Sequence, residues 1–169
     1  MARLLATKRE RWVLLTTKPA DPDAVTSTEA NAGIRGECHL TTNSRLSPTG
    51  SATIQEAAIC EGTAASVPTD RQFEGNLEVF RDMDPDTGLP EASGDEVFGA
   101  LAEFGTRLWI LKSVGPEYTE DFVEGHPYSL YEVVTDEPQD PTDRNGSIKN
   151  VVPLHVQNAW TNNAIDDGS

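Results

Sequence analysis

Residues 93–114, SGDEVFGALAEFGTRLWILKSV, join an amphipathic helix directly to the most apolar strand of the chain. Ser93 and Glu96 have the spacing of a capping box, in which a hydroxyl and a carboxylate satisfy free backbone N–H groups at a helix start. Gly105 is typical of the residue that follows a helix. We therefore predict a helix over about 94–104. Its apolar face repeats with helical spacing and consists of Val97, Phe98, Leu101 and Phe104.

Residues 106–114 predict a strand that is buried on both faces. Its centre holds four contiguous large apolar residues, Leu108 to Leu111, and neither face can be left in water without exposing a large apolar patch. The helix covers one face. A second sheet or a neighbouring subunit must cover the other.

The rest of the chain is predicted to consist mainly of strands. Residues 71–82 show this most clearly, because apolar residues and Gly75 alternate with polar ones, which indicates one buried and one solvated face. A short helical turn is expected at 26–29. The other predicted strands are 8–18, 34–40, 53–59, 128–135 and 147–156.

Long polar segments separate these strands. Two turn-rich stretches flank the strand at 53–59 and form an excursion over 41–70, whereas connections in compact domains usually span about four to six residues. Loops of this kind often contact a partner. We expect a single domain over 1–169, with an N-terminal segment at 1–11 and a C-terminal arm at 157–169.

The charge of the chain argues against some classes of partner. The 169 residues include 28 acidic and 13 basic ones, which gives a net charge of −15. Clamping nucleic acid requires clustered Lys and Arg to neutralise phosphates, so specific DNA binding is not expected. No apolar run has the length of a membrane span, and the N-terminus lacks the apolar core of a signal peptide. We expect no membrane association and folding in the cytoplasm.

The acidic segment after residue 81 resembles a calcium loop only in part. Asp82, Asp84 and Asp86 match the first three ligand positions, but Thr87 stands where Gly is needed and Ser93 where the bidentate Glu is needed. An ordinary Asp/Pro/Gly turn is the favoured interpretation. The sequence leaves open whether the three aspartates bind an ion.

No other motif predicts an enzyme, a cofactor or a metal centre. The three histidines, His39, His126 and His155, are far apart and form no catalytic pattern. They are expected to be structural. The two cysteines, Cys38 and Cys60, are too few for a zinc site and are expected to be buried thiols on separate strands.

Some large apolar residues are candidates for contacts between subunits. Trp160 stands in a polar tail with no local core to join, which favours a role as an anchor into its own or a neighbouring subunit. Trp12 and Trp109 lie in predicted strands, where core packing is the simpler interpretation. The predicted subunit-interface residues are Trp12, Leu46, Trp109, Trp160 and Ile165.

The order of features is distinctive, from a basic N-terminal strand to an Asn-rich tail. Three short phrases mark it: VFRD at 79–82, YEVVTDEPQ at 131–139 and RNGSIK at 144–149. In this order and in these phrases the chain resembles the major tail protein, the tail tube subunit of long-tailed non-contractile bacteriophages, of the kind that infects actinobacteria. The resemblance covers nearly the whole chain and contains no catalytic signature.

The resemblance implies a mainly β, tail-tube-type sandwich or barrel with one flanking helix, long loops and terminal arms. It implies a virion structural protein without enzyme activity or cofactors, assembled in the host cytoplasm. Its subunits would close into hexameric rings and stack into a tube around the tape measure protein, with the tail terminator and distal tail proteins as further partners. DNA would pass through the lumen without specific binding, and acidic walls would repel it.

Three other classes stay open from the residues alone. A tail terminator or connector would share the fold, and a terminator would form a single ring. An acidic protein that mimics DNA would present a compact acidic face, whereas the carboxylates here are scattered among loops. An enzyme would require a histidine and carboxylates to meet in a pocket.

Overall fold

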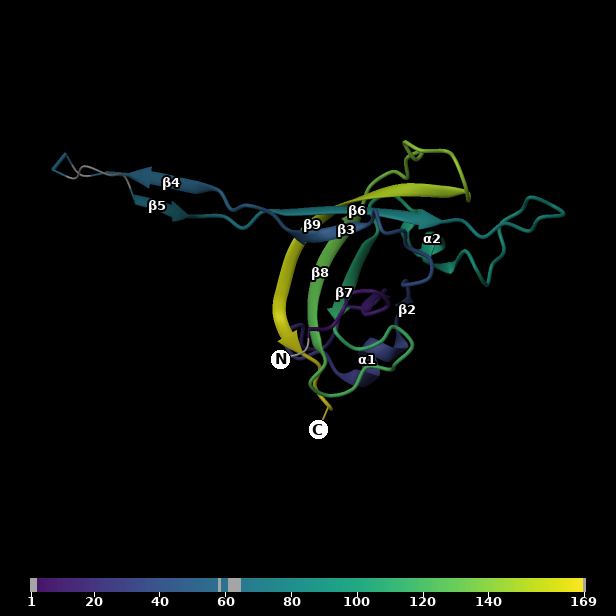
Figure 1. Cartoon of the computed structure of the whole chain (residues 1–169), viewed down its shortest axis with the longest axis horizontal. Coiled ribbons are helices and arrows are strands. Elements are labelled where there is room, and N and C mark those ends of the chain that lie inside the picture. Colours follow the sequence, from purple (N-terminus) through teal and green to yellow (C-terminus); the bar gives the residue numbers. More distant parts are fainter. Residues whose placement is uncertain (1–2, 58, 61–64, 169) are drawn as a thin grey trace.

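A curved sheet of seven antiparallel strands forms the body of the protein (Figure 1). The structure is a computed structural model that describes residues 3–57, 59–60 and 65–168. The strand order is β2-β1-β7-β8-β9-β6-β3, and β4 and β5 pair separately as a hairpin. The strands are β1 (Glu10–Leu15), β2 (Ile34–Arg35), β3 (Arg45–Pro48), β4 (Thr53–Glu56), β5 (Ala65–Pro68), β6 (Phe73–Phe80), β7 (Arg107–Val114), β8 (Pro127–Thr135) and β9 (Lys149–Ala164). The helices in the described residues are α1 (Ser27–Ala32) and α2 (Glu96–Leu101).

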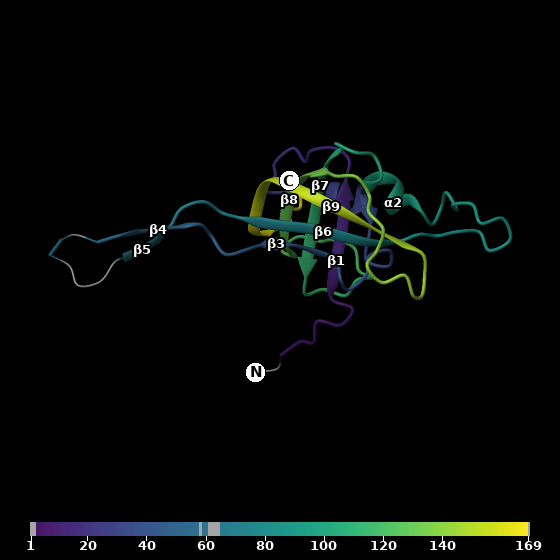
Figure 2. The same ribbon diagram turned by 90° about the horizontal axis from the view of Figure 1, so that it is seen from above.

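The long strand β9 folds the sheet over on itself. Its first residues, Lys149 to Pro153, pair with β6, and residues from Leu154 onward pair with β8. Because one strand serves both halves, the sheet bends around an apolar interior (Figure 2). The mainly β fold class predicted from the sequence is confirmed.

The inner face of the sheet holds the larger apolar cluster. It draws side chains from both halves of the sheet, including Leu14 of β1 and Leu77 of β6, and α2 adds Val97 and Leu101. All four side chains are 0% or 1% exposed. Each such burial contributes about 1.5–3 kcal/mol to folding. The two halves of the sheet and α2 are therefore held together as one unit.

The outer face carries a second apolar cluster beneath α1. Ala30 of α1 and Phe122 from the loop between β7 and β8 pack there against β1, β7 and β8. Strand β7 contributes to both clusters, since Leu108 and Ile110 face inward and Leu111 faces outward. The prediction that this strand is buried on both faces is confirmed.

The helix after residue 93 is shorter than predicted. It runs from Glu96 to Leu101, and its N-cap is Asp95, whose side chain makes no capping hydrogen bond. The predicted capping box at Ser93 is therefore wrong, because the N-cap lies two residues later. The Asp95 carboxylate does not cap the helix and instead accepts from the guanidinium of Arg81 at 2.7 Å. Phe104 lies beyond the helix and is 68% exposed.

A capping box does occur at α1, in the turn predicted at 26–29. The Thr26 hydroxyl accepts from the Glu29 backbone N–H, and the Glu29 carboxylate accepts from the Thr26 backbone N–H. The fold thus has a second helix beside the one that the sequence predicts.

The segment 41–70 is more regular than an excursion of loops. It contains β3, which joins the edge of the sheet, and β4 and β5, which form a hairpin. Backbone hydrogen bonds from Thr49 to Gln72 and from Ala52 to Asp70 continue the ladder of β3 and β6 toward this hairpin. The strand predicted at 34–40 is reduced to β2.

The two cysteines are free thiols, as predicted, but the prediction that they are buried is wrong, because both are exposed. Cys38 follows the short strand β2 in an irregular segment, and Cys60 follows β4 in the hairpin connection. Neither residue lies on a strand that would bury its thiol.

The segment expected to begin a C-terminal arm is largely part of the sheet. Residues 157–164 form the second half of β9, and Trp160 lies opposite Leu130 of β8. The Asn-rich composition reflects the solvated positions of this strand. Beyond it, the Ile165 backbone N–H donates to the His126 carbonyl at 2.9 Å, which fixes the chain end to the body.

Candidate assembly interface

The β4–β5 hairpin projects away from the body on one side, and we call its described residues, 49–57, 59–60 and 65–72, the arm (Figures 1 and 2). Strand β6 connects the arm to the acidic loop on the opposite side. Ile54 and Val67 lie opposite each other on one face of the arm and are 52% and 57% exposed. A two-stranded hairpin without an apolar layer behind it is marginally stable in water. The arm therefore has the properties of a segment that another chain covers.

The residues predicted to make subunit contacts are not all accessible. Leu46, Ile165 and Trp12 are 0%, 2% and 5% exposed and pack inside their own subunit. Leu46 and Ile165 therefore expose almost no surface that a neighbour could contact, whereas Trp12 lines a surface groove and stays a candidate.

Trp109 and Trp160 are half-buried and stay candidates. Both pack against the outer cluster, on the two strands that flank β8. The Trp109 indole N–H is buried without a hydrogen-bond partner in the described structure. Half-buried aromatic side chains of this kind offer apolar surface to a neighbour.

A groove of about 550 Å³ lies between the N-terminal turn, the start of β1 and the segment 37–42. Its apolar wall consists of Trp12, Leu40 and Tyr118, and Lys8 stands at its rim. Lys8 adopts the left-handed conformation with φ of 60°. We call this the Lys8 groove.

A buried arginine holds the loop between β7 and β8 near this groove. Arg11 is 0% exposed and donates to the Glu120 carbonyl at 3.2 Å, the Ser113 hydroxyl at 3.1 Å and His126 Nδ1 at 3.1 Å. Its guanidinium also lies 3.8 Å from the centre of the Phe122 ring. Burial lowers the pKa of His126, and the neighbouring Arg11 charge lowers it further. A neutral His126 is required, because its Nδ1 accepts the hydrogen bond.

The other histidines are not brought into a cluster. His155 Nε2 lies 3.0 Å from the Asp136 carboxylate, and the His155 side chain is 64% exposed. The hydrogen bond from His155 lowers the pKa of Asp136. This pair lies on the outer surface of β9 and the end of β8.

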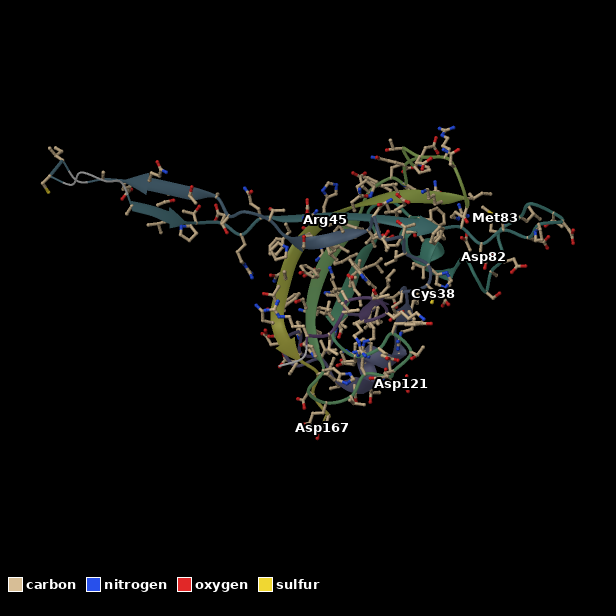
Figure 3. The ribbon with its side chains drawn as sticks, viewed as in Figure 1. Cys38, Arg45, Asp82, Met83, Asp121 and Asp167 are labelled. Carbon is tan, nitrogen blue, oxygen red and sulfur yellow. The ribbon has the colours of Figure 1, made fainter. Side chains whose placement is uncertain are left out.

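The acidic loop between β6 and α2 is organised by its own backbone. Asp84 accepts hydrogen bonds from the backbone N–H groups of Asp86 and Thr87 at 2.7 and 3.0 Å, and these bonds lower its pKa. Figure 3 shows Asp82 and Met83 at the start of this loop, on the side of the body away from the arm. In residues 3–57, 59–60 and 65–168, no group of three or more His, Cys, Asp or Glu side chains is placed to hold a metal ion.

The base of the acidic loop is fixed by a largely buried ion pair. Arg81 binds Asp95 through two nitrogens and stacks on the Phe98 ring at 3.7 Å. Such a paired geometry is among the stronger side-chain contacts.

In the described part of the chain, neither helix is long or apolar enough to span a bilayer.

The sequence model of the phage tail tube protein family matches residues 1–166. The chain belongs to the phage tail tube protein family. Membership makes this tail tube protein a structural component of a phage tail. The match confirms the prediction that the chain is a phage tail tube protein.

A solved structure has a similar fold to this tail tube protein. It matches a chain in the six-fold symmetrised cryo-EM structure of the anti-feeding prophage baseplate, with a TM-score of 0.52 and 13% identity over 100% of both chains. At this identity the likeness shows the fold alone. No curated protein sequence matches the chain.

Sequence reasoning missed the groove of this tail tube protein and placed only part of the arm. The groove combines three segments that are distant in sequence, and their meeting depends on the sheet topology. A signal for the arm was present, since the strand predicted at 53–59 contains β4 and is flanked by polar turns. The sequence also showed that basic residues gather at the N-terminus, but it did not show which part of the fold they lie beside.

Proposed function

We propose that this protein is the subunit of a non-contractile phage tail tube. In this proposal, subunits close into hexameric rings, and the rings stack around the tape measure protein during assembly in the host cytoplasm. The tail terminator and distal tail proteins cap the two ends of the tube. Genomic DNA passes through the lumen at ejection, and the protein has no catalytic role.

The arm is the observation that carries this proposal. It extends an apolar pair into solvent, and no part of the chain that the structure describes packs over that pair. Apolar surface of this kind is stabilised when a second chain covers it. A contact between the arm of one subunit and the body of the next is heterologous. Such contacts generate rings when the rotation closes and extended helical assemblies when it does not.

The charge of the chain supports a role as a DNA conduit. A net charge of −15 disfavours phosphate contacts and gives a DNA-repelling surface. Bound DNA would have to be released during ejection, whereas repelled DNA can slide. Trp109 and Trp160 supply half-buried aromatic surface for further contacts between subunits.

Negative-stain electron microscopy of the purified protein over a concentration series, with its mass measured in solution, tests this proposal. Tubes of uniform diameter built from six-fold rings are expected. Single rings that never stack favour a tail terminator. A monomer that forms small fixed complexes with a basic protein favours the DNA-mimic class instead.

A further inference from the structure

The Lys8 groove has the size and lining of a binding site for part of another chain. Its volume of about 550 Å³ accommodates several side chains. Trp12, Leu40 and Tyr118 give it an apolar wall, and residues of the N-terminal turn form its rim. An apolar strip on a partner would remove this wall from water.

The groove carries one cation without a partner. Glu10 pairs with Lys112 at 3.2 Å, and Glu37 pairs with Arg35 at 3.0 Å, so both carboxylates in the lining are already neutralised. The Lys8 ammonium has no ion pair or hydrogen bond within the described residues. A partner that brings a carboxylate beside an apolar strip therefore complements this groove.

The backbone holds Lys8 in an unusual conformation at this rim. A non-glycine residue rarely adopts positive φ, and such conformations persist where surrounding contacts impose them. The Tyr118 backbone N–H donates to the Lys8 carbonyl at 3.0 Å, and the Arg9 backbone N–H donates to the Ala6 carbonyl at 3.0 Å. These bonds fix the turn and place the lysine beside the apolar wall.

The arm supplies the complementary features. Glu56 lies two residues after Ile54 on the same strand, so its side chain shares the face that carries Ile54 and Val67. Its carboxylate has no partner within the described residues. Residues 49–70 contain three acidic residues and no Lys or Arg, whereas the N-terminal segment is the most basic part of the chain. The arm thus presents an apolar strip with an unpaired carboxylate beside it.

We propose that the Lys8 groove binds the arm of a second copy of this chain, with Ile54 and Val67 on the apolar wall and Glu56 paired with Lys8. The arm points away from the body, so its own groove is out of reach (Figures 1 and 2). Charge complementarity fixes the orientation, because opposite charges across an interface select one docking arrangement. This inference rests on the proposed function, since it names the surface that receives the arm within that assembly.

A charge-swap experiment tests the pairing. Lys8→Glu and Glu56→Lys are each expected to raise the protein concentration needed for half-maximal assembly by at least about tenfold, because each places like charges together. The double variant is expected to recover most of the loss. Gln55→Lys adds a positive charge to the opposite face of the arm and is expected to assemble like the wild type.

A disulfide experiment tests the contact directly. In a background with Cys38→Ser and Cys60→Ser, Lys8→Cys and Glu56→Cys are combined, and the assembled protein is oxidised with copper phenanthroline. A ladder of covalently linked chains is expected on a non-reducing gel. Replacing Glu56→Cys by Gln55→Cys moves the thiol to the other face and is expected to abolish the ladder.

The outcomes separate this inference from the proposed function. Wild-type tubes together with no ladder and no effect of the charge swaps overturn the inference and leave the tube function intact. A wild-type chain that stays monomeric at every concentration overturns both.

Discussion

Ile54 and Val67 face each other across the two strands of the arm, and both side chains are more than half exposed at 52% and 57%. Aliphatic cross-strand pairs normally stabilise a sheet by packing on a layer beneath them. Among residues 3–57, 59–60 and 65–168, no apolar layer covers this pair. We therefore expect another subunit to cover this exposed pair in the assembly.

The first prediction concerns this pair. Ile54→Asp is expected to prevent tube formation, because it places a charge in an interface that excludes water. The free energy of unfolding of the body should change by less than about 0.5 kcal/mol, since the side chain touches no core. Thr53→Asp, on the opposite face, is the control and should assemble normally. Sedimentation and urea unfolding give the two readouts, and equal loss of assembly in both variants would contradict the prediction.

Lys8→Gly separates conformational strain from binding. Removing the side chain relieves the left-handed conformation, worth about 1–2 kcal/mol, but increases the entropy of the unfolded chain, so a net stabilisation of about 0.5 kcal/mol is expected. Assembly should nevertheless weaken, because the unpaired ammonium is lost. A variant that is more stable and assembles as well as the wild type would show that Lys8 has no role at the interface.

Asp95→Ala tests the ion pair at the base of the acidic loop. Its side chain and that of Arg81 are 10% and 15% exposed. Removing one member leaves a largely buried charge unpaired, so a loss of about 3 kcal/mol in the free energy of unfolding is expected. Asp86→Ala, in the exposed part of the same loop, should change the free energy by less than about 0.5 kcal/mol. Urea unfolding at pH 7 measures both, and similar values would refute the assignment.

His126 predicts a pH dependence of stability. Its pKa is lowered from 6.5 in the folded state, so the unfolded chain binds more protons just below that pH and stability must fall as the pH falls through this window. His126→Gln retains a hydrogen-bond acceptor for Arg11 without a titrating group. Its stability should therefore decrease less than that of the wild type between pH 7.5 and pH 5.5. Identical slopes in thermal unfolding would contradict this.

Local sequence signals predicted the central strand and the helical turn at 26–29. The four contiguous apolar residues from Leu108 to Leu111 require burial on both faces of the strand. Thr26 and Glu29 lie within four residues of each other and cap α1. The predicted cap at Ser93 is wrong, because the helix has its N-cap at Asp95, whose carboxylate binds a distant residue, Arg81. Contacts over such distances are set by the fold and carry no local pattern.

The sheet register explains the remaining differences. Trp160 was assigned to an arm because its neighbours are polar, but pairing with β8 places it opposite Leu130. The Lys8 groove likewise depends on how β1, the segment 37–42 and Tyr118 meet. Each residue was visible in the sequence, while their proximity required the long-range pairing of strands.

The most direct test of assembly through the arm is to remove it. Replacing residues 50–71 with Asn-Gly leaves β3 and β6 joined by a tight hairpin turn, because Pro48 and Phe73 are already paired. Electron microscopy and solution mass are then compared for this variant and the full chain at equal concentration. The expected result is a folded monomer, whose far-UV spectrum differs from that of the full chain only by the loss of β4 and β5, beside wild-type rings and tubes. Rings or tubes of the same diameter from the armless variant would contradict it.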